Sequence, residues 1–145
     1  MKKEKFWGMK RSSVETKGWW YHISLHKLNR NTNMKGVGLL AKVHAIISTP
    51  TNQEEFDKYY FGIHIPMGEQ LPHLKKLSIQ KVVGTNYTME NLYIVTELEY
   101  ENIELLQESL ASDIGCKVRG DVQNLAEFLP KPPDIVITDW KSWLM

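Results

Sequence analysis

The sequence predicts an α+β fold in which strands and helices follow one another in the order β-α-β-β-α-β. Four short runs are rich in β-forming residues, at 41–49, 74–83, 92–100 and 135–140. A long segment with helical spacing follows the first run, and two shorter helical segments lie between the third and the fourth. This order is that of the ferredoxin-like split βαβ arrangement, an antiparallel sheet with its helices on one face.

The first helix is predicted from about residue 53 to about residue 70, after an N-cap at Thr51 or Asn52. Its apolar residues recur at the i, i+3, i+4, i+7 spacing of a helix with one buried face. They are Phe56, Tyr59, Tyr60, Ile63, Met67 and Leu71. Pro66 is expected to interrupt or bend this helix, because proline lacks an N–H and clashes with the preceding turn.

The second half of the chain completes the sheet. A turn at 84–86 joins the second and third strands, helical segments cover about 103–110 and 114–128, and a proline-rich connection leads to the last strand. With all helices on one face, the other face of the sheet stays uncovered, and we expect it to carry apolar residues. Two such faces packed together in a symmetric homodimer would close a barrel.

Composition limits the classes of function. The formal net charge is +1, so the chain as a whole gives no case for nucleic acid as a partner. A single cysteine, Cys116, excludes an internal disulfide framework and suits a reducing, cytoplasmic location. No apolar run approaches the roughly 20 residues that span a membrane. Phosphate loops, the dinucleotide fingerprint, GxSxG and CxxC motifs are also missing, so nucleotide-dependent chemistry has no support.

The charge is divided unevenly along the chain. Residues 1–40 hold nine basic and two acidic side chains, and the remainder holds nine basic and fifteen acidic ones. Residues 1–38 also lack sustained periodicity, so we expect a basic N-terminal extension that is disordered or not native, followed by one folded domain at 39–145. In the non-native alternative, translation starts at Leu39 or Leu40, because the codons for Lys35-Gly36-Val37 can resemble a ribosome-binding site.

One run of residues resembles a known family. Phe56, Tyr59, Tyr60, His64, Pro66, Met67, Leu71 and Pro72 resemble the characteristic helix of the EthD family, within the dimeric α/β-barrel superfamily. Tyr100-Glu101-Asn102 resembles the end of the family's third strand, and Leu110, Gly115, Asp121 and Phe128 its helical region. The resemblance covers about 41–140. It implies a homodimeric ferredoxin-like barrel with a cleft between sheet and helices, and relatives that act on small, often aromatic compounds. One departure is His73, where the family often has glycine.

His64 is the first catalytic candidate. An imidazole titrates near pH ~6.5 and can take and return a proton at neutral pH. Tyr60 is expected to assist it, and Tyr59 and Met67 to bind substrate on the same helix. In the structural alternative, His64 caps the bent helix by bonding a carbonyl freed by Pro66. The resemblance makes His64 the family's characteristic histidine.

Other candidates are weaker. His44 lies in the first strand and would line the same cleft as His64, face the dimer barrel, or simply pack with one hydrogen bond. A metal site of His44, His64 and His73 has no supporting spacing, so no metal is expected. Glu97 and Glu99 share a strand face and are expected to be solvated, and Asp139 is a further group that could orient a histidine.

The predicted function is that of an EthD-like protein that binds a small apolar or aromatic compound in a cleft. As an enzyme it would be a cofactor-independent oxidoreductase or monooxygenase, or a proton-transfer enzyme, that uses His64. The alternative is a non-catalytic ligand-binding or stress-associated dimeric barrel, in which His64 only fixes the helix. We expect no cofactor, although haem or flavin binding needs no short motif and stays open.

Overall fold

The computed structural model describes residues 40–140, and the predictions for the N-terminal extension and for an internal start lie outside them. Its centre is a four-stranded antiparallel sheet in the order β2-β3-β1-β4. Because β3 lies between β1 and β2, the first βαβ unit is split, which confirms the ferredoxin-like fold. The strands are β1 (Ala41–Ser48), β2 (Lys76–Lys81), β3 (Leu92–Tyr100) and β4 (Asp134–Asp139).

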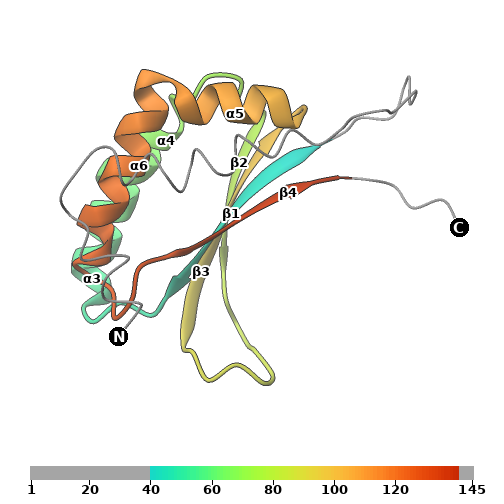
Figure 1. Ribbon diagram of the computed structural model, residues 1–145. Coiled ribbons are helices and arrows are strands. Elements are labelled where there is room, and N and C mark those ends of the chain that lie inside the picture. The colour runs from blue at the N-terminus through green and yellow to red at the C-terminus, as the bar shows by residue number, and fades with distance from the viewer. Residues whose placement is uncertain (1–39, 141–145) are drawn as a thin grey trace, which may run out of the picture. The chain divides into compact units, whose positions relative to one another are not determined.

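The helices of residues 40–140 lie on one face of this sheet, as Figure 1 shows. They are α3 (Gln53–Tyr59), η1 (Tyr60–His64), α4 (Ile65–Gly68), α5 (Ile103–Ala111) and α6 (Asp113–Ala126). Side-chain oxygens of Asn52, Asn102 and Ser112 accept backbone N–H bonds at the three main N-termini. No helix among the described residues is long and apolar enough to cross a membrane.

The first helix changes its winding just before Pro66. From Tyr60 to His64 it is a π-helix, and the Ile65 N–H bonds the Tyr60 carbonyl, five residues earlier. The wider turn brings the residue five positions after Tyr60, in place of three or four, onto the buried face. Ile65 is therefore buried, whereas Ile63, predicted to be buried, is 48% exposed. The prediction for Ile63 was wrong because it assumed an uninterrupted α-helical period.

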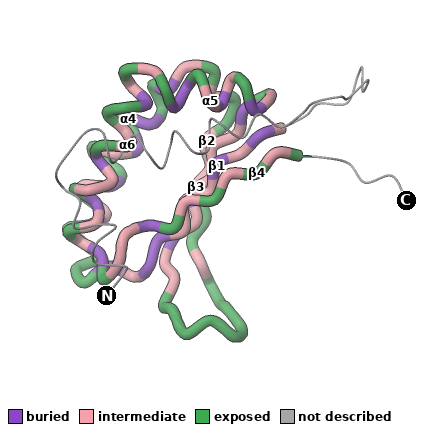
Figure 2. The backbone as a smooth tube through the Cα atoms, in the orientation of Figure 1, coloured by how far each residue is buried: buried purple, intermediate pink, exposed green. Residues whose placement is uncertain are grey.

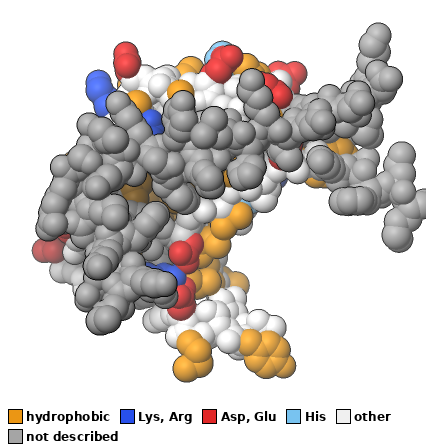
Figure 3. Space-filling model, in the orientation of Figure 1, with side chains coloured by type: hydrophobic (Ala, Val, Ile, Leu, Met, Phe, Trp, Pro, Cys, Tyr) orange, Lys and Arg blue, Asp and Glu red, His pale blue; other side chains and the backbone are white. Residues whose placement is uncertain are grey.

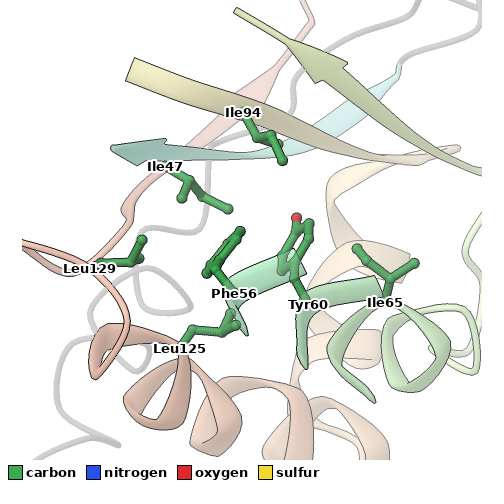
Figure 4. Packing of buried hydrophobic residues seen from close by; sticks show 7 residues of the cluster. All are labelled: Ile47, Phe56, Tyr60, Ile65, Ile94, Leu125 and Leu129. Atoms are coloured by element: carbon green, nitrogen blue, oxygen red, sulfur yellow. The ribbon is translucent and has the colours of Figure 1, made fainter. Parts of the chain in front are cut away.

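The hydrophobic core lies between the sheet and the helices (Figure 4). It joins residues from β1, the first helix, β3 and the region of α6: Ile47, Phe56, Tyr60, Ile65, Ile94, Leu125 and Leu129. Phe56 stacks on Tyr60, with ring centroids 5.1 Å apart, and meets Tyr93 and Phe128 edge to face. The first helix is therefore fixed against both neighbouring layers by its aromatic face.

The helix-free face of the sheet is mixed, not apolar as expected. Strand register places Lys42 and His44 on this face, opposite Glu99 and Glu97. Lys42 Nζ lies 2.8 Å from Glu97 and 3.7 Å from Glu99. These bonds lower the pKa of Glu97 and raise that of Lys42. The apolar part of the face is smaller and consists of Ile46, Val95 and Val136.

The turn from the first helix to β2 is built on a strained residue. His73 has φ 64°, a left-handed conformation that glycine adopts without cost. Its ring nitrogen Nε2 lies 3.2 Å from Glu108. The turn therefore forms with histidine where the resembling family often has glycine, and the strain lies in the backbone of His73.

Candidate functional site

The site centres on a histidine and a carboxylate that face each other from two helices. His64 ends η1, and Asp121 lies in the middle of α6. His64 Nδ1 is 2.7 Å from Asp121 Oδ2. The Asp121 side chain is 6% exposed and that of His64 13%, so the contact is largely shielded from solvent.

Asp121 accepts hydrogen bonds from three side chains. Tyr59 Oη and Asn124 Nδ2 both donate to its Oδ1, the latter at 2.9 Å, while His64 bonds Oδ2. Burial by itself would raise the pKa of Asp121, but the bonds from Tyr59, Asn124 and His64 outweigh it and lower that pKa. Asp121 is therefore an anion at neutral pH.

The charge of Asp121 fixes the tautomer of His64. A carboxylate accepts hydrogen bonds and donates none, so Nδ1 must carry the proton in the contact. In the neutral ring, Nε2 then holds the lone pair. No residue in the described part of the chain bonds Nε2. The carboxylate–imidazole pair is thus arranged so that Nε2 can take a proton, with the resulting positive charge held beside Asp121.

Tyr60 supports His64 with its ring, not with its hydroxyl. The two rings stack with centroids 5.6 Å apart and an interplanar angle of 16°. The hydroxyl instead bonds Thr96 on β3. Burial raises the pKa of Tyr60 to about 12, so it holds its proton at neutral pH. The geometry does not bring this hydroxyl to His64.

The two expected binding residues of the same helix have different positions. The hydroxyl of Tyr59 is engaged by Asp121, and this bond and its partial burial raise the pKa of Tyr59. Tyr59 therefore belongs to the surroundings of the carboxylate. Met67 lies in α4 and is half-buried. Among the large apolar side chains of this helix, Phe61 and Ile63 are exposed, at 46% and 48%.

The structure does not bring the three candidate histidines together. His44 lies on the helix-free face of the sheet, where Nε2 bonds Thr138 at 3.1 Å and Nδ1 is 3.5 Å from Glu97. His44 is therefore on the opposite side of the sheet from His64, and its bond to Thr138 agrees with the alternative of a packed histidine with one hydrogen bond. Its place in a dimer barrel stays a prediction. His73 pairs with Glu108. Within residues 40–140, no group of three His, Cys, Asp or Glu could hold a metal ion.

Asp121 is the functional candidate that the sequence reasoning missed. The resemblance includes Asp121 without giving it a role, and Asp139 is the carboxylate that the sequence offers to orient a histidine. The signal was present: Asp121 sits at helical spacing within the apolar stripe Val118, Val122, Leu125 and Phe128. A carboxylate on the buried face of a helix needs a donor, and a neighbouring helix carried a histidine. His64 also bonds this carboxylate, not a freed carbonyl at the helix bend.

Comparisons with known proteins agree with this fold. No family model matches the chain. An uncharacterised 11.0 kDa protein from the thcB–thcC intergenic region of Rhodococcus erythropolis is 25% identical over 85 residues, covering 59% of this chain and 82% of the relative. The crystal structure of an EthD family protein from Bacillus halodurans C-125 superposes with a TM-score of 0.59 and 25% identity, covering 70% of this chain and 99% of that one.

A second solved structure, an EthD-like protein from Ralstonia eutropha JMP134, shares the fold with a TM-score of 0.51 at 14% identity, covering 70% of this chain and 92% of that one. These two structures, together with the residues of the first helix, confirm the resemblance that the sequence indicates: the chain has the ferredoxin-like fold of EthD-family structures.

Proposed function

We propose that this protein binds a small apolar or aromatic compound next to His64 and transfers a proton to or from it without a bound cofactor. The observation that carries the proposal is the 2.7 Å contact between His64 Nδ1 and the buried carboxylate of Asp121. It orients the ring, sets its tautomer and leaves Nε2 as the proton acceptor. Asp121 is the positioning residue in this reaction, and His64 is the catalytic residue.

The geometry favours proton transfer over the oxidative reactions that the resemblance also leaves open. A carboxylate-bound imidazole with a free acceptor nitrogen is the arrangement that general acid–base catalysis needs. Nothing in the arrangement of His64, Asp121, Tyr59 and Asn124 supplies a step that is particular to oxidation. The neighbouring Phe61 and Ile63 are exposed apolar side chains that suit an apolar ligand.

A homodimer is part of the same proposal. Within residues 40–140, one face of the sheet carries no helix, and Ile46, Val95 and Val136 lie on it beside the paired charges of Lys42 and Glu97. A second copy packed on this face would bury its apolar part and close the barrel that the fold leaves open.

The tautomer of His64 can be tested before any substrate is known. We expect ring nitrogen chemical shifts in ¹⁵N NMR to show a protonated Nδ1 and an unprotonated Nε2 for neutral His64. Asp121→Asn should remove this preference. Asp57→Asn is the matched control, because Asp57 also accepts a tyrosine hydroxyl, from Tyr93 at 2.9 Å, and does not contact His64. An Nε2-protonated ring in the unsubstituted protein would refute the proposed base.

Turnover tests the catalytic claim. Native mass spectrometry of the purified protein would identify a retained ligand from which to choose substrates. His64→Ala should then lower turnover at least ~100-fold, the lower end of general acid–base catalysis. His73→Ala is the control, since this histidine pairs with Glu108 and takes no part in the contact between His64 and Asp121. Ligand binding with unchanged turnover in His64→Ala would favour the non-catalytic barrel instead.

A further inference from the structure

The most exposed apolar side chains of the described residues lie on one loop. The residues between β2 and β3, 82–91, form a hairpin arm that projects beyond the sheet, on the side away from the helices in Figure 1. Val83, Tyr87 and Met89 are 98%, 93% and 101% exposed, about as much as in an unfolded chain. Figure 2 shows the arm exposed along most of its length, and Figure 3 shows apolar side chains gathered at its tip.

The arm is hydrogen-bonded to its neighbours at its base. At its base, the Val82 N–H bonds the Tyr93 carbonyl at 2.9 Å, and the Thr49 N–H bonds the Asn91 carbonyl at 2.7 Å. Near the tip, Asn86 Oδ1 accepts the Tyr87 N–H at 2.8 Å. The first two bonds tie the base of the arm to β3 and to the residue that follows β1, whereas the bond near the tip joins two neighbouring residues.

The chemistry of the arm indicates a protein partner. No residue from 82 to 89 is charged, so the arm lacks the lysines and arginines that bind phosphate backbones or anionic lipid surfaces. Tyrosine and methionine are enriched at the centre of protein interfaces. The partner surface should therefore be apolar and should not carry a row of unpaired charges.

The chain itself exposes such a surface at another corner of the sheet. Val136 on β4 and Trp140 just after it are 43% and 44% exposed. They alternate with Ile135 and Ile137 and so belong to the helix-free face. The strand order β2-β3-β1-β4 puts the arm and β4 at opposite edges, and Trp140 is also at the opposite end of the strands. One copy therefore cannot cover this corner with its own arm, but a second copy can.

We propose that the hairpin arm of one copy packs on the Val136–Trp140 corner of a second copy, and that the second copy returns the same contact. The inference rests on the homodimer of the proposed function and adds the residues that hold it. Two-fold-related sheets can pack face to face with perpendicular strands in two ways. One sets arm against arm, and the other, which is the arrangement meant here, places each arm over the diagonally opposite corner of the other sheet. A reciprocal contact of this kind closes a two-fold dimer and does not extend into a filament.

The arm also explains how a mixed sheet face can sustain a dimer. The paired charges of Lys42, Glu97 and Glu99 occupy one part of that face, and buried ion pairs contribute little net affinity once desolvation is counted. Most of the affinity must then come from apolar contacts. The arm and the corner supply these contacts outside the charged region.

Sedimentation velocity over a concentration series tests the arm. The variant Val83→Ser/Tyr87→Ser/Met89→Ser changes no charge and no buried residue, so circular dichroism should show an intact fold. We expect the dimer dissociation constant to rise at least ~100-fold. The control Phe61→Ser/Ile63→Ser removes two exposed apolar side chains on the helix side and should leave dimerisation unchanged.

Cross-linking tests the pairing. In a Cys116→Ser background, Met89→Cys protein mixed with Trp140→Cys protein should form a disulfide-linked heterodimer on mild oxidation, faster than either protein alone forms homodimers. Dimerisation that is unchanged in the arm variant, or a cross-link between Met89→Cys arms alone, would overturn this inference only. A monomeric unsubstituted protein would overturn both this inference and the proposed homodimer. The proposed role of His64 would stand in that case, because it is tested separately by the tautomer of the ring and by turnover.

Discussion

At the scale of single residues, the sequence identifies His64 but not the group that orients it. His64 stands out because a histidine on the edge of an apolar helical stripe is unusual. Asp121 lies 57 residues further on, and its pairing with His64 depends on how α6 packs against η1. Local periodicity can show that Asp121 faces inward. It cannot show which donor meets it there, because that is set by tertiary packing.

The stability of the fold should depend on the charge of Asp121. Its folded-state pKa is lowered, so the stabilisation is present above the unfolded-state value of about 3.9 and is lost as pH falls through the folded-state value. We expect Asp121→Asn to cost about 1–3 kcal/mol at pH 7 in urea unfolding, and the difference from the unsubstituted protein to shrink below about pH 4. A difference that is the same at pH 7 and pH 3 would contradict the role of the anion.

His73 offers a prediction in the stabilising direction. A residue with a Cβ at φ 64° carries a steric cost that glycine avoids. After allowing for the extra freedom of glycine in the unfolded state, we expect His73→Gly to raise the free energy of unfolding by about 0.5–1 kcal/mol. His73→Ala is the control, since it loses the Glu108 contact as well but keeps the Cβ, and it should give no gain. Equal effects of both substitutions would mean that backbone strain is not the cause.

At the scale of elements, sequence periodicity predicted each helix and strand but not the π-turn. The interruption expected at Pro66 is present as the change of winding just before it, between Tyr60 and His64. A pattern of i, i+3 and i+4 positions cannot reveal one extra residue in a turn, because both Ile63 and Ile65 are apolar. The π-turn keeps His64 stacked on Tyr60 and buries Ile65 in place of Ile63.

Two glycines in α6 should respond oppositely to alanine. A Cβ on Gly115 would lie 2.3 Å from the Ser109 carbonyl oxygen and 2.5 Å from that of Leu110, both backbone atoms at the end of α5. A Cβ on Gly120 would meet nothing within 4 Å. We expect Gly115→Ala to lower the free energy of unfolding by about 2–3 kcal/mol, and Gly120→Ala to raise it by about 0.5–1 kcal/mol.

Urea unfolding of the two variants checks this pair, and each serves as the other's control for the same substitution in the same helix. The physical difference is the sharp corner between α5 and α6, where Ser112 caps the helix by accepting the Gly115 N–H at 3.0 Å. A neutral Gly115→Ala would show that this corner opens easily. Gly115 would then have no close-packing reason to be glycine.

At the scale of the whole molecule, the order of elements was enough to predict the sheet and its helical layer. The split βαβ topology follows from four strands and the helical segments between them. The composition of the helix-free face was predicted less well. The strands contain many apolar residues, but register decides which face each one occupies, and it sends Val43 and Ile47 to the core and Lys42 and His44 to the other side.

The predicted division of the chain at residues 38 and 39 yields a last test. We propose that the domain from residue 39 onward folds without the basic segment before it. A chain that begins at Leu39 after an initiator methionine should then unfold within about 4 °C of the full chain, which corresponds to less than ~1 kcal/mol. Differential scanning calorimetry measures this midpoint. Repeating it at high salt separates an electrostatic contribution of the first residues to the midpoint from a contribution by packing.

The charges make the salt dependence informative. Residues 1–40 carry a net charge of +7 and the rest of the chain carries −6, so an electrostatic association between the two would stabilise the full chain at low ionic strength and fade as salt screens it. A drop of the midpoint by more than about 8 °C that persists in high salt would instead mean that the first residues pack on the core. That result would refute the division, because the domain would then require the segment in order to fold fully.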